Sequence, residues 1–418
     1  MKIHFINTKI ILTFLLSACM ILFSCEIENI TFNKDKEDNI NNIPLTEKQK
    51  SIIQSGNKFT FDLLKNNNEL AGENFMISPL SISLALGMTA NGAKNNTLNE
   101  MLTVLGFDNV EIEDFNKFFK YIVAILLGLD DKVTLSIANS IWYNNNFNVL
   151  QSFLDVNQKY YNAEISALDF CSADAPATIN NWVANATNDK ITEIIEQIGP
   201  DVVMYLINAI YFYGEWKYEF DKSQTENKKF YLHDGTAVEV PMMMMETELK
   251  YYSDGSTQII ELPYGNGNFV MNLLLPANEQ TPANLLNSLT VTKWNDWTKE
   301  LHKREILLTM PKFKFEYEKG LIPVLESLGI NDLFNGNADL SGINGMGGLC
   351  VSDVKHKTFI DVNEEGTEAA AVTSVEVIYT GEDALTHIVM NRPFVFMIRE
   401  VSTESILFAG VVANPNKE

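Results

Sequence analysis

The feature that most constrains the fold is a long, almost wholly apolar run that covers residues 202–213. It reads Val-Val-Met-Tyr-Leu-Ile-Asn-Ala-Ile-Tyr-Phe-Tyr, so β-branched and aromatic side chains dominate and Gly and Pro are absent. This composition favours a β-strand, and the lack of polar alternation indicates that both faces of the strand are covered. A chain that contains this strand must therefore place layers of structure on each side of a sheet.

Helical and strand-like patterns alternate through the rest of the chain. Helix starts are predicted at Ser78-Pro79 and at two capping boxes, Thr46-x-x-Gln49 and Thr97-x-x-Glu100. Helical periodicity covers residues 177–198, and strand patterns cover residues 133–143, 228–232, 238–245, 258–262, 269–275, 306–315, 394–399 and 406–412. No linker interrupts residues 46–415, so we expect one large α+β domain with several sheets over residues 46–418.

The charge balance argues against a nucleic-acid partner. The chain has 54 acidic and 31 basic residues, and its formal net charge is -23. Binding to nucleic-acid phosphates depends on clustered Lys and Arg. The densest basic spots, Lys228-Lys229 and His302-Lys303-Arg304, are ordinary surface charge by this standard.

The N-terminus predicts export. Lys2 and Lys9 precede an apolar run over residues 10–23, and no acidic residue appears before position 26. This pattern is typical of a secretory signal peptide, which we assign to residues 1–24. Residues 25–45 are rich in Asn and charge, and they predict a flexible tether between the signal and the body.

A cysteine at the end of the signal indicates a lipid anchor. Ser24-Cys25 lies where the chain turns polar and resembles the lipobox of bacterial lipoproteins, in which the Cys is acylated and becomes the new N-terminus. Ala18-Cys19 fits the lipobox letters better, but apolar residues follow it, so we favour Cys25 over Cys19. An ordinary cleaved signal or an uncleaved membrane anchor is the alternative. We expect a protein attached to the bacterial cell envelope or outer surface through lipid alone, or otherwise secreted.

The body shows no signature of catalysis or metal binding. Cys171 and Cys350 are too few for a disulfide framework, and we expect two buried thiols. The sequence contains no HExxH, GxSxG or Walker motif. We therefore predict no metal, no cofactor and no enzymatic activity.

One segment combines the features of a loop and a strand. Residues 367–380 contain no Gly, Pro or basic residue, but Gly366 and Gly381 flank them. In an extended conformation one face carries small or apolar side chains, namely Thr367, Ala369, Ala371, Thr373, Val375 and Val377. The other face carries Glu368 and Glu376, as expected of a face that meets water. A surface helix or an Ala-rich strand is possible, but we favour a segment that is a loop in one state and an inserted strand in another.

Several motifs in sequence order resemble those of the serpin family. They lie at residues 74–83 (NFMISPLSIS), 91–94 (NGAK), 208–216 (NAIYFYGEW), 356–371 (HKTFIDVNEEGTEAAA) and 391–398 (NRPFVFMI), and together they span nearly the whole body. The resemblance implies three β-sheets, eight to nine helices and an exposed reactive loop between about residues 364 and 390. It also implies a monomeric inhibitor that a protease attacks as a substrate and that traps the acylated protease by inserting the loop into the largest sheet.

The resemblance assigns roles to particular residues. It places a hinge at Glu364, Gly366, Thr367, Glu368, Ala369, Ala370 and Ala371, where Val372 is bulkier than the residue usual in the family. It places a polar cluster beneath the middle of the main sheet, the shutter, at Ser78, Ser81, Asn208 and His356.

Counting from Gly366 as in inhibitory serpins puts the scissile bond between Thr380 and Gly381, with Tyr379 or Ile378 as alternatives on its amino side. No Lys or Arg occurs between Lys357 and Arg392, which disfavours trypsin-like targets. We expect elastase- or subtilisin-like serine proteases as targets first and papain-like cysteine proteases second. A non-inhibitory binding or carrier protein is the alternative function.

Overall fold

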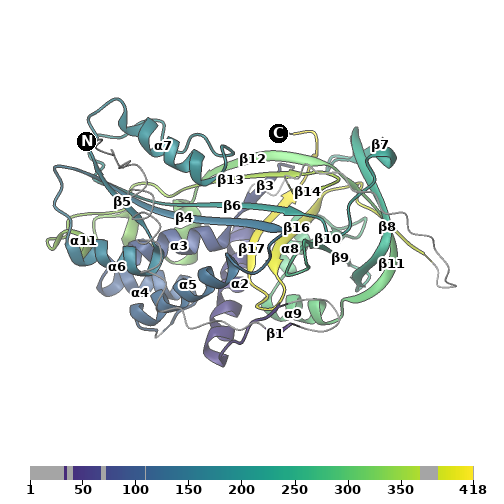
Figure 1. Ribbon diagram of the computed structural model, residues 1–418, viewed down its shortest axis with the longest axis horizontal. Coiled ribbons are helices and arrows are strands. Elements are labelled where there is room, and N and C mark those ends of the chain that lie inside the picture. The colour runs from purple at the N-terminus through teal and green to yellow at the C-terminus, as the bar shows by residue number, and fades with distance from the viewer. Residues whose placement is uncertain (1–32, 35–40, 67–71, 109, 368–384, 418) are drawn as a thin grey trace, which may run out of the picture.

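The computed structural model describes residues 33–34, 41–66, 72–108, 110–367 and 385–417. Two large β-sheets form the body, and most of the helices lie toward one end of it, with α8 and α9 nearer the other (Figure 1). The α-helices of the described residues are α2 (Glu47–Asn66), α3 (Pro79–Ala90), α4 (Asn95–Val104), α5 (Ile112–Leu126), α6 (Gln151–Tyr161), α7 (Ala175–Ala186), α8 (Pro282–Ser288), α9 (Val291–Lys299), α10 (Ile322–Leu328) and α11 (Ser341–Asn344). Two 3₁₀-helices, η1 (Lys222–Gln224) and η2 (Asp332–Phe334), complete the helical elements.

A six-stranded sheet contains most of the apolar run of residues 202–213, as strand β6. Its strands, in spatial order, are β12 (Phe313–Gly320), β13 (Lys355–Val362), β14 (Gly366–Thr367), β6 (Met204–Glu215), β4 (Val133–Asn144) and β5 (Glu164–Leu168). Helix α7 packs on one face of this sheet and α3 on the other (Figure 1). The prediction that the apolar run is a strand covered on both faces is therefore confirmed.

A nine-stranded sheet forms the second layer. In spatial order its strands are β15 (Thr386–Val389), β11 (His302–Pro311), β8 (Ala237–Ser253), β9 (Thr257–Tyr264), β10 (Phe269–Pro276), β16 (Phe394–Glu400), β17 (Ile406–Val412) and β3 (Phe75–Ile77), and β7 (Glu226–Tyr231) also pairs with β8. The long strand β8 pairs with β11 along most of its length and with β9 at its last four residues, so it joins two groups of strands into one sheet. A third, two-stranded sheet pairs β1 (Asn33–Lys34) with β2 (Asn41–Asn42).

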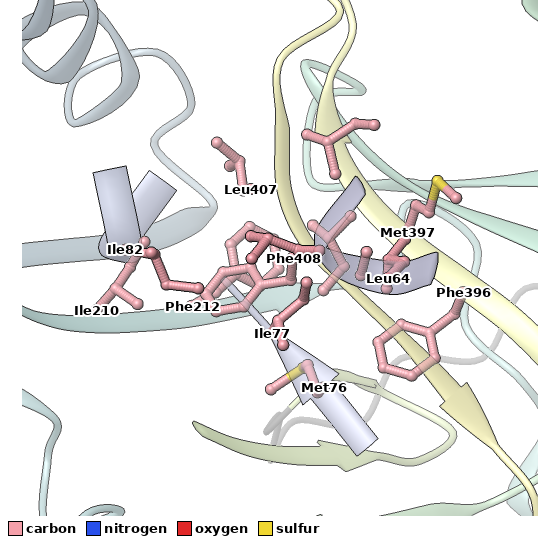
Figure 2. Close-up of a cluster of buried hydrophobic side chains, with 14 of the residues drawn as sticks. Leu64, Met76, Ile77, Ile82, Ile210, Phe212, Phe396, Met397, Leu407 and Phe408 are labelled. Carbon is pink, nitrogen blue, oxygen red and sulfur yellow. The ribbon is translucent and has the colours of Figure 1, made fainter. Parts of the chain in front are cut away.

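The main hydrophobic core lies between the two large sheets. Phe212 of β6 meets Phe408 of β17 edge to face, with ring centroids 6.2 Å apart, and Figure 2 shows both among the apolar side chains of this cluster. A second, smaller cluster fills the space between α7 and the outer face of the six-stranded sheet. Burial on both faces explains why the sequence of β6 shows no polar alternation.

Two of the three predicted helix starts are confirmed. The Thr46 Oγ1 accepts the Gln49 N–H, and Ser78 accepts the Ser81 N–H at the start of α3. The third is wrong, because Thr97 lies inside α4 and its hydroxyl accepts the N–H of Asp339.

The predicted helix over residues 177–198 is correct only as far as Ala186. Asn188 and Asp189 adopt left-handed backbone conformations, which end α7. The Asn180 side chain then accepts the N–H groups of Ile194 and Ile195, so an irregular segment buries apolar residues at helix-like spacing.

The predicted strand over residues 306–315 is two strands in different sheets. Strand β11 ends at Pro311, and β12 begins at Phe313 in the other sheet. The break lies at Lys312, whose N–H pairs with the carbonyl of Pro241.

The structure corrects the expected burial of the cysteines. Cys171 and Cys350 are both free and exposed rather than buried. The end of the predicted tether also contacts the body, because Ile43 is 3% exposed and its N–H donates to Ser402 Oγ. Among the helices that the structure describes, none combines the length and apolar character that crossing a membrane would need.

Candidate functional site

The predicted hinge begins as a short strand inside the six-stranded sheet. Thr367 of β14 pairs with Val362 of β13 on one side and with Gly214 of β6 on the other. Its side chain is 3% exposed, and its hydroxyl lies 2.7 Å from the hydroxyl of Tyr264. Burial raises the pKa of Tyr264, so this phenol stays protonated and can donate the bond.

Gly366 lies where no side chain fits. A Cβ at this position would collide with the backbone carbonyl oxygen of Gly214 and would lie 2.8 Å from the Cα of Glu215. Backbone atoms cannot move aside as a flexible side chain can, so close approach of β14 to β6 requires glycine here.

Two buried acids precede the glycine. Glu364 lies 2.8 Å from Lys312 Nζ and accepts a hydrogen bond of 2.7 Å from the Thr225 hydroxyl. Burial alone would raise the pKa of Glu364, but the hydrogen bonds from Lys312 and Thr225 outweigh it and hold the pKa below its usual value. Glu365 forms an ion pair with Lys222. The turn between β13 and β14 is therefore fixed by charge as well as by backbone pairing.

Trp216 packs against the same turn. Its ring stacks on Tyr264 with centroids 4.4 Å apart, and its Nε1 donates to the carbonyl of Asn363. Sequence reasoning included Trp216 in a family motif without a role and missed Tyr264, Lys312 and Thr225. A buried Glu364 needs a cation nearby, but the sequence gives no sign of which lysine provides it.

Three of the four predicted shutter residues are joined by hydrogen bonds. The N–H of Ser78 donates to His356 Nε2 at 3.0 Å, and the Ser78 hydroxyl accepts the N–H of Ser81 and donates to the carbonyl of Leu407. His356 is 5% exposed, and burial lowers its pKa to about 4. The ring is therefore neutral near pH 7, with its proton on Nδ1 because Nε2 accepts a bond.

Asn208, the fourth predicted shutter residue, lies on β6, whereas His356 lies on β13. Asn208 Nδ2 donates to Asn139 Oδ1 at 2.8 Å. Its Oδ1 is buried and has no hydrogen-bond partner among the described residues. A buried unsatisfied oxygen of this kind is uncommon and calls for an explanation.

Among the described strands, β6 and β13 are not paired with each other, and we call the strand position between them the slot. Within the described residues these two strands pair with β14 at one end and share no ladder beyond Thr367. A cavity of about 480 Å³ occupies the far part of the slot, and Asn208, His356 and Ser81 are among its lining residues. Among the described residues, the strand position between β6 and β13 is therefore occupied only as far as Thr367, and the shutter residues lie beside the rest of it.

Several predicted site residues lie outside the described residues. They are Glu368, Ala369, Ala370 and Ala371 of the hinge, Ile378, Tyr379, Thr380 and Gly381 around the predicted scissile bond, and Cys19 and Cys25 of the predicted anchor. Among the residues that the structure does describe, no group of three or more His, Cys, Asp or Glu could hold a metal ion.

Comparison with known proteins identifies the family to which this site belongs. A family model described as Serpin (serine protease inhibitor) matches residues 54–415. The chain belongs to the serpin family. Serpin B3 of Homo sapiens is 35% identical over 388 residues, which cover 87% of this chain and 100% of that protein. The family is described as one of protease inhibitors rather than enzymes. The predictions of a serpin fold and of a protein that is not an enzyme are therefore both confirmed.

Solved serpin structures share the fold over most of the chain. The thermophilic serpin tengpin, in its native state, is 36% identical with a TM-score of 0.81, and the match covers 89% of this chain and 96% of that one. Human thyroxine-binding globulin in complex with thyroxine is 30% identical with a TM-score of 0.79, covering 88% and 98%. The fold of a family described as protease inhibitors is therefore also found in a thyroxine-binding protein.

Proposed function

We propose that this serpin is inhibitory and traps target proteases by inserting its reactive loop into the slot between β6 and β13. The observation that supports this most strongly is the position of Thr367, which already fills the first place of the slot. The next residues of the same parity are Ala369, Ala371 and Thr373, all small enough to follow it. A charged, bulky or Pro residue at these positions would oppose insertion.

The chemistry begins as ordinary proteolysis. The serine hydroxyl of the protease attacks the carbonyl carbon of Thr380, its proton passes to the protease's histidine, and the amine of Gly381 leaves with a proton. The new ester links the protease to Thr380. Fourteen residues inserted at about 3.3 Å each would then move the ester roughly 45 Å along the slot.

Insertion of the loop releases free energy that can prevent hydrolysis of the ester, the second step of proteolysis. About a dozen new backbone hydrogen bonds at about 1 kcal/mol net each are enough to distort the attached protease. Hydrolysis of the ester requires catalytic groups placed to within about 1 Å, so distortion preserves the covalent link. The form with an open slot must therefore be kinetically trapped rather than the most stable form.

We propose elastase- or subtilisin-like serine proteases as the first targets and papain-like cysteine proteases as the second. Thr380 is small and uncharged, which suits a shallow specificity pocket. A cut after Tyr379 would instead suit chymotrypsin-like enzymes. If the cut lies between Thr380 and Gly381, Tyr379 is the residue before the cleaved pair, and an apolar residue there suits the main pocket of papain-like proteases. We propose further that the inhibitor acts outside the cell as a monomer, attached to the envelope through acyl chains on Cys25.

A Thr367→Arg variant tests the inhibitory mechanism. A guanidinium at this buried position costs several kcal/mol, so insertion should lag behind ester hydrolysis and the variant should be cleaved with little covalent complex. The measurement is the yield of SDS-stable complex with elastase, subtilisin, papain and trypsin, with mass spectrometry of the cut site. Glu368→Arg is the matched control, because position 368 has the opposite parity to 367 and an inserted strand would direct the guanidinium there toward water.

Equal complex yields from Thr367→Arg and the unaltered protein would refute insertion from this end. If the unaltered protein forms no complex with any of the four proteases, the carrier function seen in the thyroxine-binding relative becomes the better account. Efficient trapping of trypsin with a cut outside residues 378–381 would overturn the proposed specificity alone.

A further inference from the structure

The N-terminal segment joins the body beside helix α5. The N–H of Ile43, which is 3% exposed, donates at 2.8 Å to Ser402 Oγ in the turn between β16 and β17. One residue later, the carbonyl of Pro44 accepts a hydrogen bond of 3.1 Å from the hydroxyl of Tyr121 in α5. The point at which this segment meets the body is therefore fixed, and the outer side of α5 lies next to it.

Strand pairing shortens the reach of this segment. Strands β1 and β2 are antiparallel, so Asn33 lies beside Asn42. Eight residues separate Cys25 from Asn33, a span of at most about 29 Å, whereas an unpaired chain from Cys25 to Asn42 could span about 60 Å. A body of this size is about 50 Å across. With the strands paired, the surface around Ile43 must therefore stay on the side of the body that faces residue 25.

The outer side of α5 suits a lipid surface. Residues 115–129 contain no Asp or Glu, although the chain has 54 acidic residues. Leu127, at the end of the helix, is 47% exposed. Tyr and Lys side chains favour the boundary between lipid and water, because each has an apolar body and a polar end. The half-buried and exposed side chains on this side of α5, which we call the tether-side face, are Lys117, Lys120, Tyr121, Val123, Ala124 and Leu127.

The charges on this face favour contact at its C-terminal half. Lys117 forms an ion pair of 3.0 Å with Glu113 in the first turn of α5, so its charge is balanced. Lys120 is exposed and lies one turn further along, beside the apolar residues Val123 and Leu127. A lysine next to exposed apolar side chains can place its ammonium at the lipid phosphates while its stem covers the apolar groups.

We propose that the tether-side face lies on the bilayer to which Cys25 is attached, with Val123 and Leu127 among the lipid headgroups and Lys120 at the phosphates. This inference rests on the proposed acylation of Cys25 and adds an orientation to it. The acyl chains provide the attachment, and the short span gives even a weak second contact a high effective concentration. Figure 1 shows α5 apart from β11, so contact through α5 does not cover the strand pair at which the reactive segment ends.

Lysine labelling tests the orientation on the acylated protein. The protein is added at low density to preformed vesicles of phosphatidylethanolamine and phosphatidylglycerol and treated with a membrane-impermeant amine reagent. Mass spectrometry then gives the rate of modification of Lys120 relative to Lys229 of β7, both of which are exposed in the structure. We expect this ratio to be about fivefold lower in the unaltered protein than in a Val123→Gln/Leu127→Gln variant, because the variant loses its apolar contact with the lipid.

Two further variants serve as controls. Leu127→Gln alone changes one exposed side chain and should give an intermediate ratio, so the test does not depend on the double variant folding. Met346, on the turn after α11, is 82% exposed and provides a matched apolar site away from α5. Met346→Gln should give the same ratio as the unaltered protein; a ratio raised as far as in the double variant would contradict a specific face.

The outcomes separate the face from the anchor. If the unaltered protein floats with the vesicles but its Lys120 reacts as fast as in the double variant, the face is wrong and acylation stands. If Lys120 is protected only at high protein density, a second copy of the chain covers the face and the lipid contact is wrong. If the protein is not acylated and does not float with the vesicles, the attachment and the orientation fall together.

Discussion

His356 links the stability of the shutter to pH. Its ring accepts the N–H of Ser78, and burial holds its pKa at about 4, below the 6.5 of an exposed histidine. Between these values the unfolded chain binds a proton that the folded chain does not. The stability due to this group is therefore complete above pH 6.5 and is lost as the pH falls toward 4, by about 3 kcal/mol in all.

A His356→Gln variant should show a shallower loss of stability over this range. At pH 7.5 the variant should be less stable than the unaltered protein, because Gln packs less well than His at this site. The Gln side chain takes up no proton as the pH falls. Urea unfolding midpoints at pH 7.5, 6.0, 5.0 and 4.5 measure the difference, and the curves of the two proteins should converge at low pH. His302, whose side chain is 73% exposed, is the control: His302→Gln should leave the slope unchanged. Parallel curves for His356→Gln and the unaltered protein would contradict this assignment.

At the scale of elements, the short strand β14 determines how the reactive segment meets the sheet. Gly366 allows its backbone to approach Gly214 without a Cβ between them. Gly366→Ala should push β14 away from β6 at a cost of about 1–3 kcal/mol. We expect a severalfold lower yield of covalent complex, measured by gel densitometry with the best target protease. Gly320→Ala, where no atom lies within 4 Å of the added methyl, should behave like the unaltered protein; a similar loss there would exclude the steric explanation.

The elements differ in how far their sequence determines them. The apolar run that became β6 and the Ser78 cap of α3 could be predicted, because periodicity and capping are local properties. The end of α7 and the cap of α4 could not. Thr97 has the right spacing for a capping box, but its hydroxyl accepts the N–H of Asp339, which is distant in sequence. A local sequence pattern cannot reveal a partner so far along the chain.

The candidate site shows the same division. The resemblance to serpins grouped Ser78, Ser81 and His356, which occur in recognisable motifs, and hydrogen bonds join these three residues in the structure. Tyr264 and Lys312 lie outside those motifs and reach the hinge only through the pairing of strands far apart in sequence. The exposure of Cys350 was missed for a related reason: free thiols are usually buried, and no local sequence pattern shows that this one reaches the surface.

At the scale of the whole molecule, our proposal makes the location of the protein depend on its first residues. If Cys25 is acylated, the mature protein begins there and partitions into membranes through its lipid. Cys25→Ala should release the protein to the soluble fraction or leave the signal uncleaved. Fractionation with N-terminal mass spectrometry distinguishes these results. A membrane-bound Cys25→Ala variant with a processed N-terminus would instead point to Cys19, for which Cys19→Ala is the matched test.

The two ends of the reactive segment are held in different sheets. Thr367 pairs within the six-stranded sheet, and Thr386 pairs with Ile306 of β11 in the nine-stranded one. Residue 380 is six residues from Thr386, a reach of roughly 20 Å, whereas full insertion needs about 45 Å of travel. The intact chain can complete the strand only if β15 leaves β11, but a cut chain can complete it at once and has no route back. On the proposed mechanism each molecule therefore acts only once, so the inhibitory capacity equals the number of intact copies, and a cell that relies on it must replace one chain for every protease removed.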